Sequence, residues 1–95
     1  MVAYVVVDVD VYDPVVFEEY RQLGVPTLGR YGARVLARSE AAEPLEGDWR
    51  PRRFVILEFE SVAKAKEWHA SPDYARAKVI RQRSAETNSI VVQGL

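Results

Sequence analysis

The sequence predicts a small α+β fold whose elements follow one another as strand, helix, strand, strand, helix, strand. Its length of 95 residues suits one domain, so residues 1–95 are expected to form a single unit. A valine-rich N-terminal segment alternates as a strand does, and an Asp-Pro and a Ser-Pro pair mark the starts of helical periods. These three observations carry the prediction.

The first strand is expected over residues 2–11, where β-branched side chains are frequent. Its odd positions from the third residue on are apolar, whereas its even positions mix Tyr4 and Val6 with Asp8 and Asp10. Because side chains alternate between the two faces of a strand, one face should meet a dry core. The other face is half polar and should meet a cavity or a partner.

Helix starts are expected where a side chain can cap free amide hydrogens, at Asp13, Ser61 and Ser71. The first helix should kink or restart at Pro26, which lacks an amide hydrogen, and should stop at Gly32. The second helix should reach about His69, and a further helical piece should reach about Ala85.

The remaining strands are expected over residues 33–39, 53–60 and 88–93. Alternation along the second strand places Val35 and Ala37 on one face and Arg34, Leu36 and Arg38 on the other. The third strand is apolar on both faces apart from Glu58, so it should be a central strand.

Residues 40–52 are expected to form a long loop, because two prolines and a glycine interrupt them. The alternative is a loop that contains a short additional strand around residues 43–46. Trp49 should pin this loop to the body of the protein or to a partner.

This order is the ferredoxin-like βαββαβ pattern, in which right-handed crossovers place the helices on one face of a four-stranded antiparallel sheet. The reverse face would stay open and carry Tyr4, Val6, Leu36, Phe54, Ile56, Asp8, Glu58 and either Arg34 or Arg38. So large an exposed apolar surface is a liability, and pairing two such faces about a two-fold axis removes it. We therefore expect a homodimer.

Four segments, YVVVDVDVYDPVVFEEYR, VPTLGRYGARVLAR, LEGDWRPRRFVILEFES and WHASPDYARAKVIRQRSA, resemble a known family. It is the family of domains of unknown function 1330, within the dimeric α/β-barrel superfamily. The resemblance implies a ferredoxin-like protomer and a homodimer built by sheet-to-sheet packing. The superfamily includes cofactor-free monooxygenases, isomerases, dehalogenases, haem-handling enzymes and stress-linked proteins, and a shared fold does not decide among these activities. The resemblance assigns no catalytic residues to this chain.

Composition narrows the function classes. The chain has no cysteine, which excludes disulfides and thiol nucleophiles, and a net charge of −1 provides no global field that attracts nucleic acid. The third strand also lacks the glycines and basic-aromatic pattern of RNA-recognition modules, so no nucleic-acid partner is expected. No signal peptide or membrane span is expected, which leaves a cytoplasmic location by default.

Three residues are candidates for acid/base catalysis. Asp8 and Glu58 should lie on the open face on neighbouring strands, where partial desolvation raises a carboxyl pKa; alternatively, each pairs with an arginine. His69 has three readings: a ring packed beside Trp68 or bonded to the last carbonyls of its helix, an acid/base group, or a haem ligand. With one histidine and no cysteine, we predict no metal site and no cofactor.

Two functions follow from these residues. The first is small-molecule binding at a pocket between sheet and helices, with cofactor-free monooxygenase- or isomerase-like catalysis as the reaction this pocket would support; the expected ligand contacts are Tyr4, Arg38, Trp49, Phe54 and Tyr74. The second is a non-catalytic dimeric module, structural or regulatory, whose polar sheet face is only an interface. A cavity in the dimer favours the first function, and a filled seam favours the second.

Overall fold

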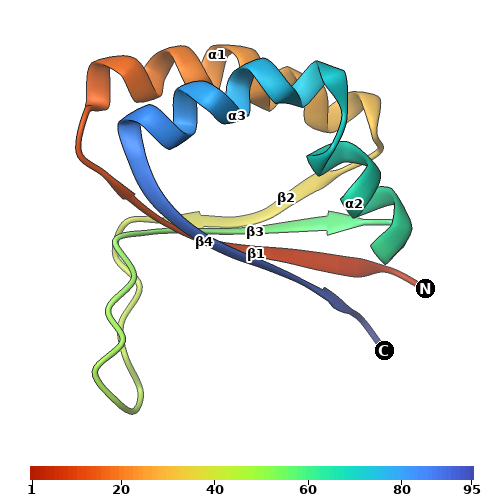
Figure 1. The fold of residues 1–95 in the computed structure, drawn as a ribbon. Coiled ribbons are helices and arrows are strands. Elements are labelled where there is room, and N and C mark those ends of the chain that lie inside the picture. Colours follow the sequence, from red (N-terminus) through yellow and green to blue (C-terminus); the bar gives the residue numbers. More distant parts are fainter.

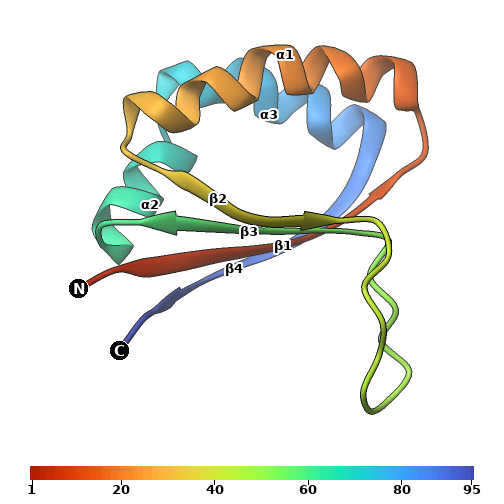
Figure 2. The same cartoon turned by 180° about the vertical axis from the view of Figure 1, so that it is seen from behind.

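The computed structural model describes residues 1–95 and has the predicted order of elements. Figure 1 shows α1 and α3 side by side over one face of the sheet and the short α2 at one end, and Figure 2 shows the same layers from behind. The sheet is antiparallel with strand order β2-β3-β1-β4. The elements are β1 Ala3–Val11, α1 Pro14–Arg30, β2 Arg34–Ser39, β3 Arg53–Phe59, α2 Val62–His69, α3 Pro72–Ser84 and β4 Ala85–Gln93. The protein is therefore an α+β ferredoxin-like fold with helices on one face of the sheet.

The predicted helix starts are confirmed by the cap contacts. The side chains of Asp13, Ser61 and Ser71 each accept a hydrogen bond from an amide three residues further on. The helix α1 does not restart at Pro26 but continues through it, and the Thr27 hydroxyl donates to the carbonyl of Gly24 at 2.6 Å in this turn. Gly32 follows the end of α1 with φ +70°, in the left-handed region that glycine tolerates.

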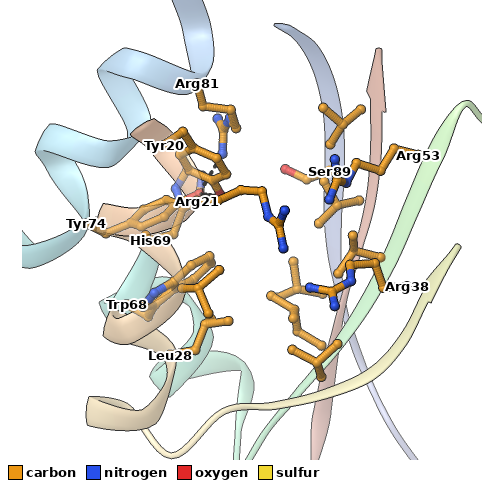
Figure 3. Close-up of a pocket in the computed structure, with 18 of the residues that line it drawn as sticks. Tyr20, Arg21, Leu28, Arg38, Arg53, Trp68, His69, Tyr74, Arg81 and Ser89 are labelled. Atoms are coloured by element: carbon orange, nitrogen blue, oxygen red, sulfur yellow. Dashed lines mark hydrogen bonds between the residues drawn. The ribbon is translucent and has the colours of Figure 1, made fainter. Parts of the chain in front are cut away.

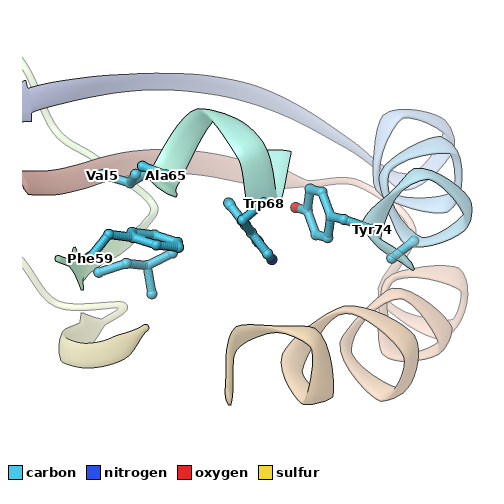
Figure 4. Close-up of a cluster of buried hydrophobic side chains, with 7 residues drawn as sticks. Val5, Phe59, Ala65, Trp68 and Tyr74 are labelled. Atoms are coloured by element: carbon cyan, nitrogen blue, oxygen red, sulfur yellow. The ribbon is translucent and has the colours of Figure 1, made fainter. Parts of the chain in front are cut away.

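The main core lies between the sheet and α2. Phe59 and Trp68 pack with ring centroids 5.4 Å apart, and Trp68 stacks on Tyr74 at 4.2 Å. Figure 4 shows these rings with Val5 and Ala65 around them. The indole of Trp68 also donates to Thr27 at 2.9 Å, which ties α2 to α1. This core fixes one end of the helical layer against the sheet.

A β-bulge in β2 changes the face of its second half. Arg34 lies opposite Glu58 and Val35 opposite Leu57, but after the irregularity Arg38 lies opposite Val55. Residues opposite each other in a sheet share a face, so Arg38 points toward the helices, as Val55 does. The prediction that Arg38 shares a face with Arg34 was therefore wrong, because simple alternation does not allow for the inserted residue.

The loop between β2 and β3 projects from the sheet on the side away from the helices (Figure 1). Residues 43–46 form no strand, so the suggestion of an additional strand there was wrong. Trp49 fixes the loop to the open face, since its indole donates to Asp8 Oδ2 at 2.9 Å. In the structure, no helix is both long and apolar enough to cross a bilayer.

Candidate functional site

A cavity of about 90 Å³ lies between the sheet and the helical layer. Its walls come from β1, β2, β3 and β4 on one side and from α1, α2 and α3 on the other (Figure 3). Most of the wall is apolar, and the polar side chains that reach it are Tyr20, Arg21, Arg38, Arg53, His69, Tyr74, Arg81 and Ser89. No aspartate or glutamate lines it.

Two tyrosines and an arginine form a hydrogen-bonded group on the helical wall of this cavity. The hydroxyls of Tyr20 and Tyr74 lie 2.7 Å apart, and Arg81 Nη1 donates to the Tyr74 hydroxyl at 2.9 Å. Arg81 is only 9% exposed, makes no ion pair, and its buried Nε has no hydrogen-bond partner. A buried cation without an anion costs free energy, so this group is a candidate functional group.

Two side chains of the cavity wall, Tyr74 and His69, have pKa values shifted from their usual range. Burial, and then the neighbouring Tyr20, hold the pKa of Tyr74 well above its usual range, so its hydroxyl stays protonated. Burial, followed by the charges of Lys78 and Arg81, lowers the pKa of His69 below 6.5. The imidazole is therefore neutral at pH 7, so one ring nitrogen carries no proton; its Nδ1 lies 3.5 Å from Lys78 Nζ, which also donates to the His69 carbonyl at 2.8 Å.

The mouth of the cavity is lined by arginines from both walls. Arg21 comes from α1, Arg38 from β2 and Arg53 from β3, and Figure 3 shows their guanidinium groups turned toward one another. Arg53 also lies over the ring of Phe17, 5.1 Å from its centroid. Outside the mouth is a wider cleft of about 410 Å³ that shares Arg21 and Arg53 with the cavity and is also lined by Asp10, Glu18 and Glu40.

The open face of the sheet holds the two carboxylates predicted for the site, Asp8 and Glu58, and each already has a partner. Glu58 Oε1 accepts from Arg34 Nη2 at 2.8 Å and Nε at 3.1 Å, and Asp8 accepts from Trp49. Glu58 lies opposite Tyr4 and Asp8 opposite Phe54, so the two carboxylates are roughly 13 Å apart along the strands. They cannot act together on one small molecule.

The structure thus divides the residues predicted for the site. Arg38, His69 and Tyr74 line the cavity under the helices. The other five lie on the open face, where a shallow pocket of about 310 Å³ includes Asp8, Trp49 and Phe54; Tyr4 and Glu58 lie further along the same face. Trp49 packs edge-on against Phe54 with centroids 5.7 Å apart.

Sequence reasoning missed the role of four cavity residues, Tyr20, Arg21, Arg53 and Arg81. For the three arginines, the signal was a charged residue at a position that the periodicity of its strand or helix predicts to be buried. Arg53 shares its parity with Val55 and Leu57, and Arg81 follows Tyr74 and Ala77 at helical spacing. Such a mismatch of charge and pattern indicates a functional position more often than an ordinary surface charge does.

Comparison with protein families decides the classification. The model of the family described as "Domain of unknown function (DUF1330)" matches residues 2–95. The chain belongs to this family. No match is found among curated proteins.

Several solved structures have the same fold as this DUF1330 domain. A protein of unknown function from Rhodopseudomonas palustris, RPA0582, is 20% identical with a TM-score of 0.79, over 99% of this chain and 82% of that one. SnoaB from Streptomyces nogalater, a cofactor-independent oxygenase, is 10% identical with a TM-score of 0.69, over 99% and 93%. A dimeric ferredoxin-like protein of unknown function from Bacteroides fragilis is 13% identical with a TM-score of 0.66, over 98% and 96%. At these identities the likeness concerns the fold.

Proposed function

We propose that this DUF1330 domain binds a small carbonyl compound in the cavity between sheet and helices and moves a proton on it without a cofactor. One observation carries the proposal. A neutral histidine, His69, and a pair that stabilises negative charge, Tyr74 with Arg81, line the same apolar space. A base and an anion-stabilising pair together are what removal of a proton next to a carbonyl requires.

His69 acts as the base in this reaction. It accepts a proton from the carbon next to the carbonyl, and the electron pair of the broken C–H bond moves onto the carbonyl oxygen to give an enolate. The nearby charges of Lys78 and Arg81, which lower the pKa of His69, also make the protonated ring a ready donor. Return of the proton to a different atom yields an isomer.

Tyr74 and Arg81 hold the oxygen of the enolate. The Tyr74 hydroxyl remains protonated because its pKa is raised, so it can donate to an anion, and Arg81 adds positive charge behind it. In a cavity whose wall is mostly apolar, such donors are worth more than they are in bulk solvent. Reaction of the same enolate with dioxygen would instead give an oxygenated product, in line with the cofactor-independent oxygenase among the structural neighbours.

The experiment is deuterium exchange at the methyl group of acetophenone in heavy water, followed by proton NMR. The wild-type protein should accelerate exchange, and His69→Gln should lose about tenfold or more of that acceleration. Asp8→Asn and Glu58→Gln, on the other face of the sheet, are the matched controls and should exchange at the wild-type rate. No acceleration by the wild type, or equal rates with His69→Gln, overturns the proposal.

A second candidate function is a non-catalytic dimeric module, and the open face favours it. Its Asp8 and Glu58 have partners, and its centre is an apolar row in which Ala37, Ile56, Val6 and Ile90 lie side by side across the sheet. Ile90 is 65% exposed in the single chain. We propose that a second copy covers this row, which is compatible with catalysis in the cavity on the opposite face.

A further inference from the structure

The arginines at the mouth of the cavity point to the chemical class of the ligand. Four arginines line the cavity and no carboxylate does, although the chain as a whole carries a net charge of −1. The concentration of positive charge is therefore a property of this site and not of the composition. The ligand class inferred from these arginines rests on the proposed function, because the ligand and the proposed reaction share the same cavity.

The bulge in β2 is what completes the group at the mouth. Without the inserted residue, Arg38 would share the face of Arg34 and point away from the helices. With it, Arg38 faces Arg53 on the neighbouring strand and Arg21 across the cavity (Figure 3). A local irregularity of the sheet thus serves to bring a third guanidinium to one opening.

The ion pairs of these three arginines are weak or missing. Arg21 lies 3.4 Å from Glu18 on its own helix, and Arg53 lies 3.7 Å from Glu40, whose side chain is largely exposed. Arg38 has no carboxylate within ion-pair distance. Burial, and next the facing Arg21, lower the pKa of Arg53, which is the effect expected where like charges converge.

The rest of the wall is apolar and partly aromatic. Val5, Val7 and Val55 form the sheet side of the cavity, and Leu28 and Trp68 form the helical side. A flat hydrocarbon body fits between them, with one end at the arginines and the other at the Tyr74–Arg81 pair. Arginine presents paired N–H groups that match the two oxygens of a carboxylate.

We propose that the ligand is a small organic carboxylate with an apolar body, whose carboxylate lies among Arg21, Arg38 and Arg53. Its carbonyl end reaches the Tyr74–Arg81 pair. The three guanidinium groups bind the anion and fix which end of the molecule enters the cavity. Neutral molecules of the same shape lack this anchor.

Two probes of matched shape test this assignment, 4-acetylbenzoate and 4-acetylbenzamide. The chain has two tryptophans, so Trp49→Phe leaves Trp68, which lines the cavity, as the single fluorescent reporter. At low salt the carboxylate should quench Trp68 with a Kd about tenfold or more below that of the amide. Added salt should reduce this difference, because the mouth is open to solvent.

Arg38→Gln is the decisive variant, since its side chain is exposed and makes no ion pair on which folding depends. It should bring the carboxylate within about twofold of the amide and leave the amide unchanged. Arg76→Gln, an exposed arginine of α3 outside the cavity, is the control and should retain the full preference.

The outcomes separate the two proposals. Equal binding of carboxylate and amide, or a preference that survives Arg38→Gln, overturns the carboxylate assignment and leaves the cavity as a binding site. Absence of quenching by both probes overturns the assignment and argues against a ligand site in the cavity. Equal deuterium-exchange rates for the wild type and His69→Gln, with the carboxylate preference intact, contradict only the proposed proton transfer.

Discussion

The two faces of the sheet differ in whether their charged side chains have partners. On the open face, Glu58 is held by Arg34 through two hydrogen bonds, and Asp8 accepts from Trp49. On the helix-covered face, Arg38 and Arg81 have no acidic partner. Of these two, Arg81 is buried and Arg38 is exposed. A buried charge without a partner is a candidate functional group, and this difference between the faces is the reason for our proposal that the chemistry lies under the helices.

The first way to sharpen this comparison uses the two tryptophans, one for each face. Trp68 is 4% exposed and Trp49 is 60% exposed. Trp68→Ala should lower the free energy of unfolding by about 3–5 kcal/mol, because it empties the centre of the core. Trp49→Ala should cost about 1 kcal/mol, the scale of one exposed hydrogen bond and one aromatic contact.

Urea unfolding followed by circular dichroism measures both changes. Trp68→Phe keeps a ring in the core but loses the hydrogen bond to Thr27, so its loss should be intermediate. Equal costs for the two alanine variants would show that the loop is as important to the fold as the core is, contrary to the division between the faces.

The second prediction concerns what covers the open face. Ile56 lies at its centre, opposite Val6 on β1 and Ala37 on β2. In a dimer built through this face, Ile56→Glu buries a charge at the seam and should weaken association by about a hundredfold or more. Light scattering at micromolar concentration should then report a folded monomer, while the wild type is a dimer.

Leu45→Glu, in the exposed loop, is the matched control and should leave the wild-type dimer intact. A monomeric wild type, or a dimer that Ile56→Glu does not disturb, contradicts the sheet-to-sheet interface. Either result would leave the cavity untouched, since it lies on the other side of the sheet.

The fold was predictable from local signals, but the site was predictable only in part. Caps at Asp13, Ser61 and Ser71 and the alternation of β1 act within a few residues, so the sequence displays them directly. The bulge in β2 is different, because alternation alone gives the segment RVLARS two regular faces. Whether one residue is inserted depends on pairing with β3, which the local pattern does not contain.

The cavity also depends on contacts between distant segments. Gly24 of α1 approaches Ala77 of α3 so closely that an added Cβ would lie 3.4 Å from the Ala77 side chain and 3.1 Å from the Tyr20 ring. This close crossing holds the two helices to each other, with the cavity between them and the sheet. A helical period predicts that Gly24 faces inward but not which helix it meets.

The smallest expected effect concerns His69 and the pH dependence of stability. Its pKa in the folded protein is lowered, so in the window just below 6.5 the unfolded chain binds a proton that the native chain does not. The free energy of unfolding should therefore fall as pH falls through this window and level off below the native pKa. Because His69 is the only histidine, few other groups titrate there.

Melting temperatures of the wild type and His69→Gln from about pH 7.5 to about pH 5.5 measure this difference. As the pH is lowered over this range, the melting temperature of the wild type should fall further than that of the variant. The difference should be small, because the ring is only partly buried. Lys78→Met tests the cause, because removing that charge should narrow the margin. Identical pH profiles for wild type and His69→Gln would mean that the ring titrates as it does in water, and that neither burial nor the charges of Lys78 and Arg81 lower its pKa in the folded protein.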